Sequence, residues 1–318
     1  MNLCTNSYLF FLLLLFTSCS NEIETGIVPG AMEEAAVPIR ISSEWIEAST
    51  KAVVKEFTAD NVGNIGIFGT DNTTIQYKGI SPSGIENGQL TFQTTPLVYP
   101  VNGLPVLLSG YYPKQSDTGE RFTIDNSGLL NFRLTGTEDL MFASPADAGN
   151  KKVPKIVSLL FAHKLTCVSF KLINGIINNA TPLPDGNISI ITQAPNEGTM
   201  DLRSENGTLN ISKTQASLSL KSDLRLQSLP ADTTQVEGAL MLIPVSAETG
   251  ITGYTFQLAV GNNTYAISIN DMNAPVWEEG VCYELTITIK NLTPLNEQET
   301  KATGTGDYRM VGTIRELK

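Results

Sequence analysis

Short runs in which apolar and polar residues alternate recur along the chain, and this period of two most constrains its fold. Alternation is clearest over Val168 to Leu172 (VSFKL), Tyr254 to Val260 (YTFQLAV) and Cys282 to Ile289 (CYELTITI). Turn residues such as Gly261-Asn262-Asn263 separate neighbouring runs. No window of a dozen residues keeps the 3.6-residue period of an amphipathic helix. The pattern therefore predicts an all-β protein made of packed sheets rather than a parallel α/β fold.

The length of the chain favours two β-sandwich domains in tandem. About 300 of the 318 residues follow the N-terminal apolar segment, whereas one sandwich of this kind uses roughly 100 residues. The segment 145–154 (PADAGNKKVP) is rich in charge and in residues that break strands, so we expect the seam there. The predicted domains are residues 37–152 and residues 153–318.

The N-terminus has the features of an export signal. Residues 8–16 (YLFFLLLLF) form an apolar run that is shorter than the about 20 residues needed to cross a bilayer. Small residues then precede Cys19, as in a bacterial lipobox, where the signal is cleaved and the cysteine is acylated with palmitate. We therefore expect a lipoprotein signal peptide over 1–18, a polar tether over 19–36 and an outer-membrane location. The alternative is a plain signal peptide that contains a cysteine.

Two of the four cysteines, Cys167 and Cys282, are expected to remain in the folded protein, either as free thiols or as a disulfide. Cys4 is removed with the signal and Cys19 receives the lipid. Cys167 and Cys282 each lie in a segment with strand character. In an oxidising periplasm they could form a disulfide, or they could remain buried free thiols. Their separation in the sequence does not decide between these states, and no CxxC or zinc-type spacing is present.

Charge and composition argue against several classes of function. With 21 Lys and Arg against 32 Asp and Glu, the net charge of −11 disfavours nucleic acid and anionic membranes as partners. His163 is the only histidine, which excludes a multi-histidine metal site. No GxSxG segment surrounds a serine, and His163 lies in the apolar stretch 159–165, which favours a packed structural histidine. We therefore expect no enzyme, no metal site and no cofactor.

Several weak motifs follow one another in a specific order over residues 15–290. After the lipobox come the segments Ser49–Ala52 (STKA), Asn64–Phe68 (NIGIF), Tyr111–Pro113 (YYP), Asp139–Ala143 (DLMFA), Leu160–Leu165 (LFAHKL), Leu242–Pro244 (LIP) and Trp277–Tyr283 (WEEGVCY). This series resembles the Bacteroidales fimbrillin family, the type V pilins and their major and minor fimbrillin-like lipoprotein relatives. Lys51 stands where the family usually has arginine, and the tail after Asn291 has no counterpart that we recognise.

The resemblance implies a function in surface adhesion without catalysis. It implies two tandem β-sandwiches of Greek-key, transthyretin-like topology and a structural subunit of a type V fimbria (pilus). In such a family a protease cuts the lipoprotein precursor after a basic residue and removes the first strand. A strand from the next subunit then fills the open groove by donor-strand exchange, which adds one strand to an unpaired sheet edge. The implied partners are other pilin subunits in a head-to-tail polymer, the outer membrane through the lipid, and a host or bacterial surface receptor.

Mapping the family pattern on this sequence gives candidate residues for each step. The removable strand is expected within 37–45 (VPIRISSEW), with Ile39, Ile41 and Ser43 on one face. The candidate cleavage sites are Lys51, which we prefer, and Arg40 and Lys55. The candidate donor-strand residues alternate along the tail: Tyr308, Met310, Gly312 and Ile314.

Two other roles stay open at this point. The length of the chain and its strand-like tail slightly favour a stalk subunit over a pilus tip adhesin. A monomeric surface glycan-binding lipoprotein is the alternative from another class, and an exposed row of aromatic side chains would indicate it.

Overall fold

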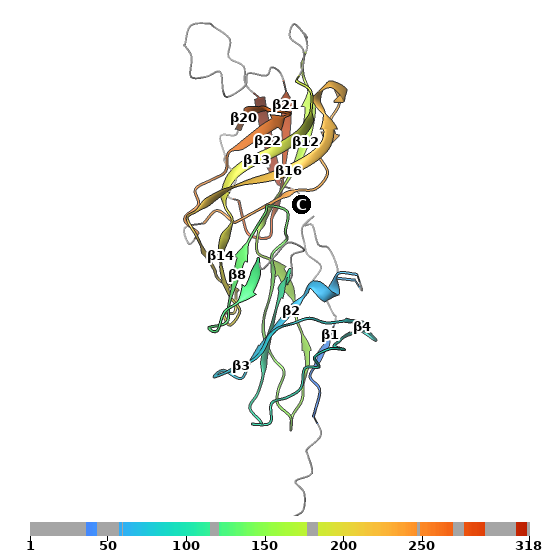
Figure 1. The fold of residues 1–318 in the computed structure, drawn as a ribbon, viewed down its shortest axis with the longest axis vertical. Helices are drawn as coiled ribbons and strands as arrows, with labels where there is room; N and C mark the ends of the chain where they lie inside the picture. The colour runs from blue at the N-terminus through green and yellow to red at the C-terminus, as the bar shows by residue number, and fades with distance from the viewer. Residues whose placement is uncertain are drawn as a thin grey trace, which may run out of the picture. The chain divides into compact units, whose positions relative to one another are not determined.

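The computed structural model describes residues 36–42, 57–58, 60–114, 121–176, 184–246, 249–269, 277–289 and 310–316, the last of these through the backbone. These residues form strands β1 to β22 and two single 3₁₀ turns, η1 (Val62–Asn64) and η2 (Leu226–Ser228), drawn in Figure 1. The prediction of an all-β fold with tandem sandwiches is confirmed. No helix among the described residues has the length and apolar character to span a bilayer.

Two sheets built from the first half of the chain enclose the first apolar core. One sheet has the order β11-β9-β6-β2-β3 and the other has the order β10-β1-β5-β4. The strands are β1 (Arg40–Ser42), β2 (Gly66–Thr70), β3 (Ile75–Ile80), β4 (Gly84–Glu86), β5 (Gln89–Thr91), β6 (Leu107–Tyr112), β9 (Met141–Asp147), β10 (Ile156–Ser158) and β11 (Phe161–His163).

A third sheet joins strands that lie far apart in the sequence. Its order is β15-β14-β8-β7, with strands β7 (Phe122–Ile124), β8 (Leu129–Arg133), β14 (Glu197–Asp201) and β15 (Leu209–Ile211). The antiparallel ladder between β8 and β14 runs over five residue pairs, from Glu197 opposite Arg133 to Asp201 opposite Leu129. This ladder ties the two halves of the chain through backbone hydrogen bonds.

The second half of the chain forms a nine-stranded sheet around its own core. The order is β16-β13-β19-β20-β22-β21-β12-β17, and β18 also pairs with β12. The strands are β12 (Thr166–Asn174), β13 (Asn187–Pro195), β16 (Gln215–Arg225), β17 (Thr234–Gln235), β18 (Leu240–Leu242), β19 (Phe256–Val260), β20 (Asn263–Ile269), β21 (Cys282–Ile289) and β22 (Met310–Glu316). The alternating runs predicted at 254–260 and 282–289 correspond to β19 and β21. Buried aromatic rings anchor this core: Trp277 makes edge contacts with Tyr254, Phe256 and Tyr283.

Pairing, rather than sequence composition, indicates where the chain passes from one sandwich to the next. Strand β10 pairs with β1, and β11 pairs with β9, so both complete the sheets of the first half. The next strand, β12, pairs with β21 in the nine-stranded sheet. The predicted boundary at residues 152/153 stays a prediction, and on this pairing we propose residues 164–165 as the division.

Strand β2 is buried on both faces, which explains why it lacks alternation. Its residues Ile67 and Phe68 point to opposite sides of the sheet, and each side carries a separate apolar core. Gly66 lies opposite Tyr111 of β6, and a methyl group on Gly66 would overlap the Tyr111 ring. A side chain as small as hydrogen is therefore needed at Gly66 for the tyrosine to lie flat on the strand.

This close approach gives a testable prediction. Gly66→Ala should lower the free energy of unfolding by about 1–3 kcal/mol, the range for an added methyl group in a packed core. Gly63→Ala is the matched control, because the nearest atom to its added methyl group is 3.8 Å away. For the double variant Gly66→Ala with Tyr111→Ala, urea denaturation should give a loss of unfolding free energy smaller than the sum of the losses in the two single variants. Additive losses would contradict the contact.

Candidate functional site: two inserted strands

Strand β1 lies inside its sheet, between β10 on one side and β5 on the other. It runs parallel to β10, with Arg40 opposite Ile156 and Ser42 opposite Ser158, and antiparallel to β5, with Ser42 opposite Gln89. Just before the strand, the Ile39 N–H donates to the Leu97 carbonyl (2.8 Å), and the Tyr99 N–H donates to the Val37 carbonyl (2.9 Å). Backbone hydrogen bonds thus hold this segment on both sides.

The two faces of β1 differ sharply. Ile39 and Ile41 are 5% and 0% exposed and belong to the core of the first sandwich, beside Val157 of β10. Arg40 points to the opposite side and is exposed. This alternation agrees with the expectation for residues 37–45, of which 43–45 lie outside the described residues. If β1 left the sheet, the backbones of β10 and β5 and an apolar trough between them would be exposed.

Strand β22 occupies an equivalent interior position in the nine-stranded sheet, between β20 and β21 (Figure 1). It is parallel to β20 from Met310 opposite Ile267 to Gly312 opposite Ile269. It is antiparallel to β21 over six residue pairs, from Glu316 opposite Tyr283 to Val311 opposite Thr288. The backbone places the donor-strand candidates Met310, Gly312 and Ile314 in this strand.

The two inserted strands share a feature that sequence patterns could not reveal. Each has one parallel neighbour, so no hairpin connects it to that side of the sheet. A strand that enters a sheet in this way can be withdrawn without passing a loop through the structure. The local sequence of β1 and β22 contains no signal for this, because the parallel neighbour of each strand lies more than 40 positions away in the sequence.

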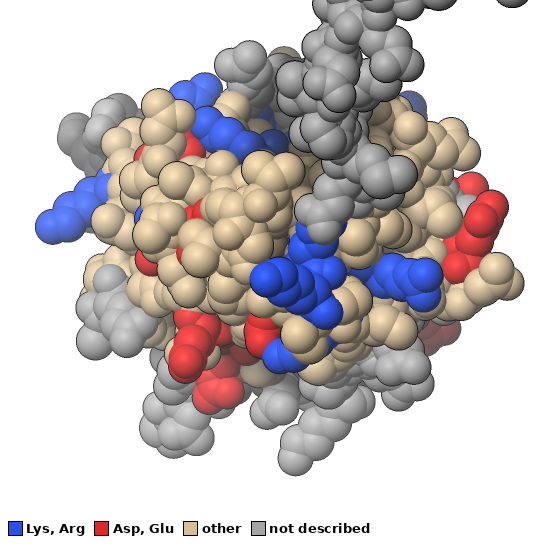
Figure 2. Space-filling model, turned by 90° about the horizontal axis from the view of Figure 1, so that it is seen from below, with Lys and Arg blue, Asp and Glu red and all other residues tan. Residues whose placement is uncertain are grey.

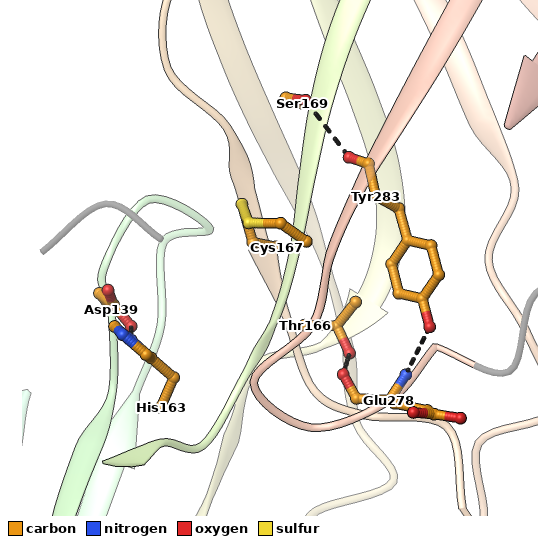
Figure 3. The surroundings of a disulfide bond; sticks show 8 residues. Asp139, His163, Thr166, Cys167, Ser169, Glu278 and Tyr283 are labelled. Carbon is orange, nitrogen blue, oxygen red and sulfur yellow. Dashed lines mark hydrogen bonds and ion pairs between the residues drawn. A yellow bond between two sulfur atoms is a disulfide. The ribbon is translucent and has the colours of Figure 1, made fainter. Parts of the chain in front are cut away.

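A disulfide ties β12 to β21 beside the inserted strand β22. Cys167 and Cys282 lie directly opposite each other in the parallel ladder, with their Cα atoms 4.4 Å apart, and they are 4% and 1% exposed. Figure 3 shows the polar contacts around it: the Thr166 hydroxyl donates to the Glu278 carbonyl (2.8 Å), and the Ser169 hydroxyl donates to the Tyr283 carbonyl (3.3 Å). Strand β21 is therefore fixed covalently on one side while it pairs with β22 on the other.

The lone histidine has a structural environment. His163 is buried, and its Nδ1 lies 2.8 Å from Oδ1 of the fully buried Asp139 (Figure 3). Its Nε2 atom is buried without a hydrogen-bond partner, so no serine or threonine hydroxyl of the described residues is within reach of it. The expectation of a packed histidine is confirmed. This geometry does not assemble a Ser-His-Asp triad, because the base has no nucleophile to activate.

Most of the motifs that carry the sequence resemblance meet in pairs. Tyr111 covers Gly66, and Asp139 contacts His163. In the second sandwich, the Val245 N–H, directly after the Leu-Ile-Pro segment, donates to the Trp277 carbonyl (2.9 Å). Each of these motifs therefore supplies one half of a contact within the fold.

The remaining site candidates divide into exposed residues and residues outside the described part. Arg40 is an exposed cleavage candidate on β1. Cys19, Lys51, Lys55 and Tyr308 lie outside the described residues. Among the described residues, no group of three or more His, Cys, Asp and Glu side chains could hold a metal ion.

The described surface does not have the aromatic row that a glycan-binding platform would need. Its exposed large apolar side chains are all aliphatic: Val101, Leu104, Val153, Ile156 and Leu160. The exposed row of aromatic side chains that would indicate a glycan-binding protein is thus missing from the part of the chain that the structure describes.

Comparison with known proteins agrees with this picture. The profile of the fimbrillin-like family matches residues 50–305. A crystal structure of a candidate cell adhesion protein from Bacteroides uniformis superimposes with a TM-score of 0.54 at 15% identity, covering 90% of this chain and 98% of the other. A candidate cell adhesion protein from Bacteroides ovatus gives 0.53 at 18% identity, covering 89% and 97%. No curated protein matches the sequence.

The family match supports a fimbrial or adhesion role at the cell surface. The family match extends over most of the sequence, and the chain belongs to the fimbrillin-like family. At these identities the two crystal structures support the fold alone.

Proposed function

We propose that this chain is a structural, stalk-type subunit of a type V fimbria that assembles by strand exchange after proteolytic removal of its first strand. Its precursor is a lipoprotein acylated at Cys19 in the outer membrane, and its partners are further subunits of the fimbria. The observation that carries the proposal is the interior position of β1, which fills an apolar core while being paired on both sides. No enzymatic activity is part of this function.

Cleavage would turn β1 from a part of the fold into a weakly held peptide. Burial of Ile39 and Ile41 contributes about 1.5–3 kcal/mol each. Once the chain is cut, these contacts must offset the roughly 4–15 kcal/mol lost when a separate peptide is immobilised. The balance favours release of the fragment. The groove then offers unpaired N–H and C=O groups of β10 and β5 to another strand.

The donor in this proposal is the tail of the next subunit. Met310, Gly312 and Ile314, with Tyr308 before them, alternate as a strand that lays one face on a groove. The parallel and antiparallel pairs that β22 makes with β20 and β21 support its ability to fill a gap between two strands. A head-to-tail contact of this kind does not close, so repetition gives a fibre.

Limited trypsin digestion of the full chain tests the cleavage step. We expect the first cut between residues 40 and 55, followed by a ladder of polymers on a gel run without boiling. Single variants Arg40→Gln, Lys51→Gln and Lys55→Gln identify the site, and we expect Lys51→Gln to slow the cut most. Cleavage elsewhere, or a cut without a ladder, would refute strand exchange.

A backbone variant tests the donor. Gly312 lies opposite both Ile269 and Ile287, and proline at this position cannot donate to the sheet. Trypsin-treated Gly312→Pro chain should give no ladder, although its own β1 is still removed. If polymers form at the normal rate, another segment is the donor.

A further inference from the structure

Two loops at one end of the first sandwich form a single rigid surface, which we call the basic tip: the loop 99–105 and the hairpin 149–156. The Val106 N–H donates to the Gly149 carbonyl and the Ala148 N–H donates to the Val106 carbonyl, both at 2.8 Å. The Lys155 N–H donates to the Tyr99 hydroxyl (3.3 Å). The Asn150 carboxamide oxygen accepts the N–H groups of Lys152 and Val153, which fixes the turn of the hairpin.

The basic tip carries nearly all of the exposed large apolar side chains of the described residues. Val101 is 98% exposed, Val153 63%, Ile156 62% and Leu104 42%. The fifth, Leu160, follows β10 by two residues. Aliphatic groups that gather on hydrogen-bonded loops and face solvent indicate an interaction surface rather than incidental exposure.

Cations lie beside Val153 and Ile156 although the whole chain is acidic. Arg40, Lys152 and Lys155 are exposed and Lys151 is partly exposed. The Asp147 carboxylate pairs with Lys155, and Asp71 lies buried beneath the loop, where it accepts a hydrogen bond from Asn102. Figure 2, which views the molecule from below, shows several Lys and Arg side chains close together near the centre of that face, with Asp and Glu side chains at other places on it. At physiological ionic strength, salt screens charges that lie more than about 8 Å away. The sign of the charge at the basic tip itself therefore decides which ligands bind there.

A hollow of about 260 Å³ joins the tip to the entry of β1. Val37, Pro38, Tyr99 and Ile156 line it, together with the cations Arg40 and Lys155. The lipid-accepting residue of the proposed function, Cys19, is 18 residues before Val37, a separation that no conformation can extend beyond about 65 Å. The tip therefore lies beside the point at which the chain enters β1.

We propose that the basic tip is a docking surface for anionic lipid headgroups, on the membrane that holds the acylated precursor. The proposal rests on the lipoprotein part of the proposed function. Lys and Arg side chains are attracted to the negative surface of a bilayer, and the aliphatic side chains enter the boundary between headgroups and acyl chains. One acyl chain holds a protein only marginally, and a basic patch is a common second signal. The tip would thus orient the precursor with its first strand toward the bilayer.

A second copy of this chain fits the surface less well. Two tips facing each other would bring like charges together. A contact between the tip and another part of the described surface would leave its aliphatic groups without an apolar partner, because Leu160 is the one other large apolar side chain exposed there. A bilayer provides both the negative charge and the apolar layer.

Sedimentation with vesicles tests the proposal on residues 19–318 with Cys19→Ser, a chain that carries neither the acyl group nor the apolar run 8–16. We expect binding to phosphatidylcholine vesicles that contain phosphatidylglycerol, and at least about tenfold weaker binding to pure phosphatidylcholine. Lys152→Glu with Lys155→Glu should weaken the binding about tenfold or more, and Val101→Ser with Val153→Ser should weaken it without a change in net charge. Lys213→Glu with Lys221→Glu is the matched control, since it changes the charge equally at exposed positions of β16 and the loop before it.

Three outcomes would overturn the proposal: no vesicle binding, equal binding to neutral vesicles, or an equal loss in the control variant. Light scattering of the protein without vesicles gives a fourth such outcome. If the protein self-associates and Val101→Ser abolishes the association, the tip is a protein contact. The vesicle experiment involves neither a protease nor a polymer. A negative result in it would therefore not contradict strand exchange, and a missing trypsin ladder would not contradict vesicle binding. Thermal melts confirm that each variant is folded.

Discussion

Replacing both cysteines of the Cys167–Cys282 disulfide by alanine should lower the free energy of unfolding by about 4–5 kcal/mol. The bond closes a loop with a sequence separation of 115 residues, and cross-linking of a loop this long removes a large conformational entropy from the unfolded chain. The folded state changes little, because the backbone ladder between β12 and β21 keeps its eight register pairs. Urea denaturation of the oxidised chain and of the double variant measures the difference.

Reduction of the unsubstituted chain is the control for this experiment. In dithiothreitol it should unfold at the urea concentration of the double variant, and the variant should not respond to the reductant. A loss below about 1 kcal/mol would contradict a bond that stabilises through the unfolded state. We also expect the reduced chain to lose β21 pairing before the first sandwich unfolds, which amide hydrogen exchange can resolve strand by strand.

Ile41→Ala should destabilise the unprocessed chain by about 2–5 kcal/mol, the range for truncation of a fully buried isoleucine. The side chain fills the first sandwich from a strand held by few residue pairs, so little else compensates for its loss. Under strand exchange the effect has a second consequence. A weakened first strand leaves its groove more often, so Ile41→Ala should polymerise faster than the unsubstituted chain once trypsin is added.

Arg40→Gln serves as the matched substitution on the same strand, because its side chain points away from the core. It should alter the unfolding free energy by less than about 0.5 kcal/mol. After processing, the Ile41→Ala chain and the unsubstituted chain are expected to have the same stability, because the strand that carried the difference is gone. If the processed Ile41→Ala chain is still less stable, then residue 41 remains in the mature fold and the proposed removal of β1 is wrong.

Alternation and turns identified the strands that have one buried face. The segment 254–260 predicted β19, and the segment 282–289 predicted β21, because in each the core-facing side chains recur at every second residue. Alternation also placed Ile39 and Ile41 on one face of a strand, and both are buried in the structure. The family resemblance then supplied what alternation could not, namely that its weak motifs belong to one fold.

Sequence reasoning was weakest where long-range pairing decides the outcome. The parallel partners of β1 and β22 lie 116 and 43 residues away in register, and no local pattern encodes them. Alternation did not predict strand β2, because both of its faces are buried and its residues do not alternate between apolar and polar. The basic tip was hidden by the net charge of −11, since an average over the chain conceals cations that the fold brings together.

The ladder between β8 and β14 has a mechanical consequence. A subunit in a fimbria bears tension when the cell it holds is dragged by flow. In this chain a ladder of five residue pairs connects the first half of the sequence to the second, in addition to the covalent backbone. The ladder would therefore share with the covalent backbone any load that passes between the two halves of the chain.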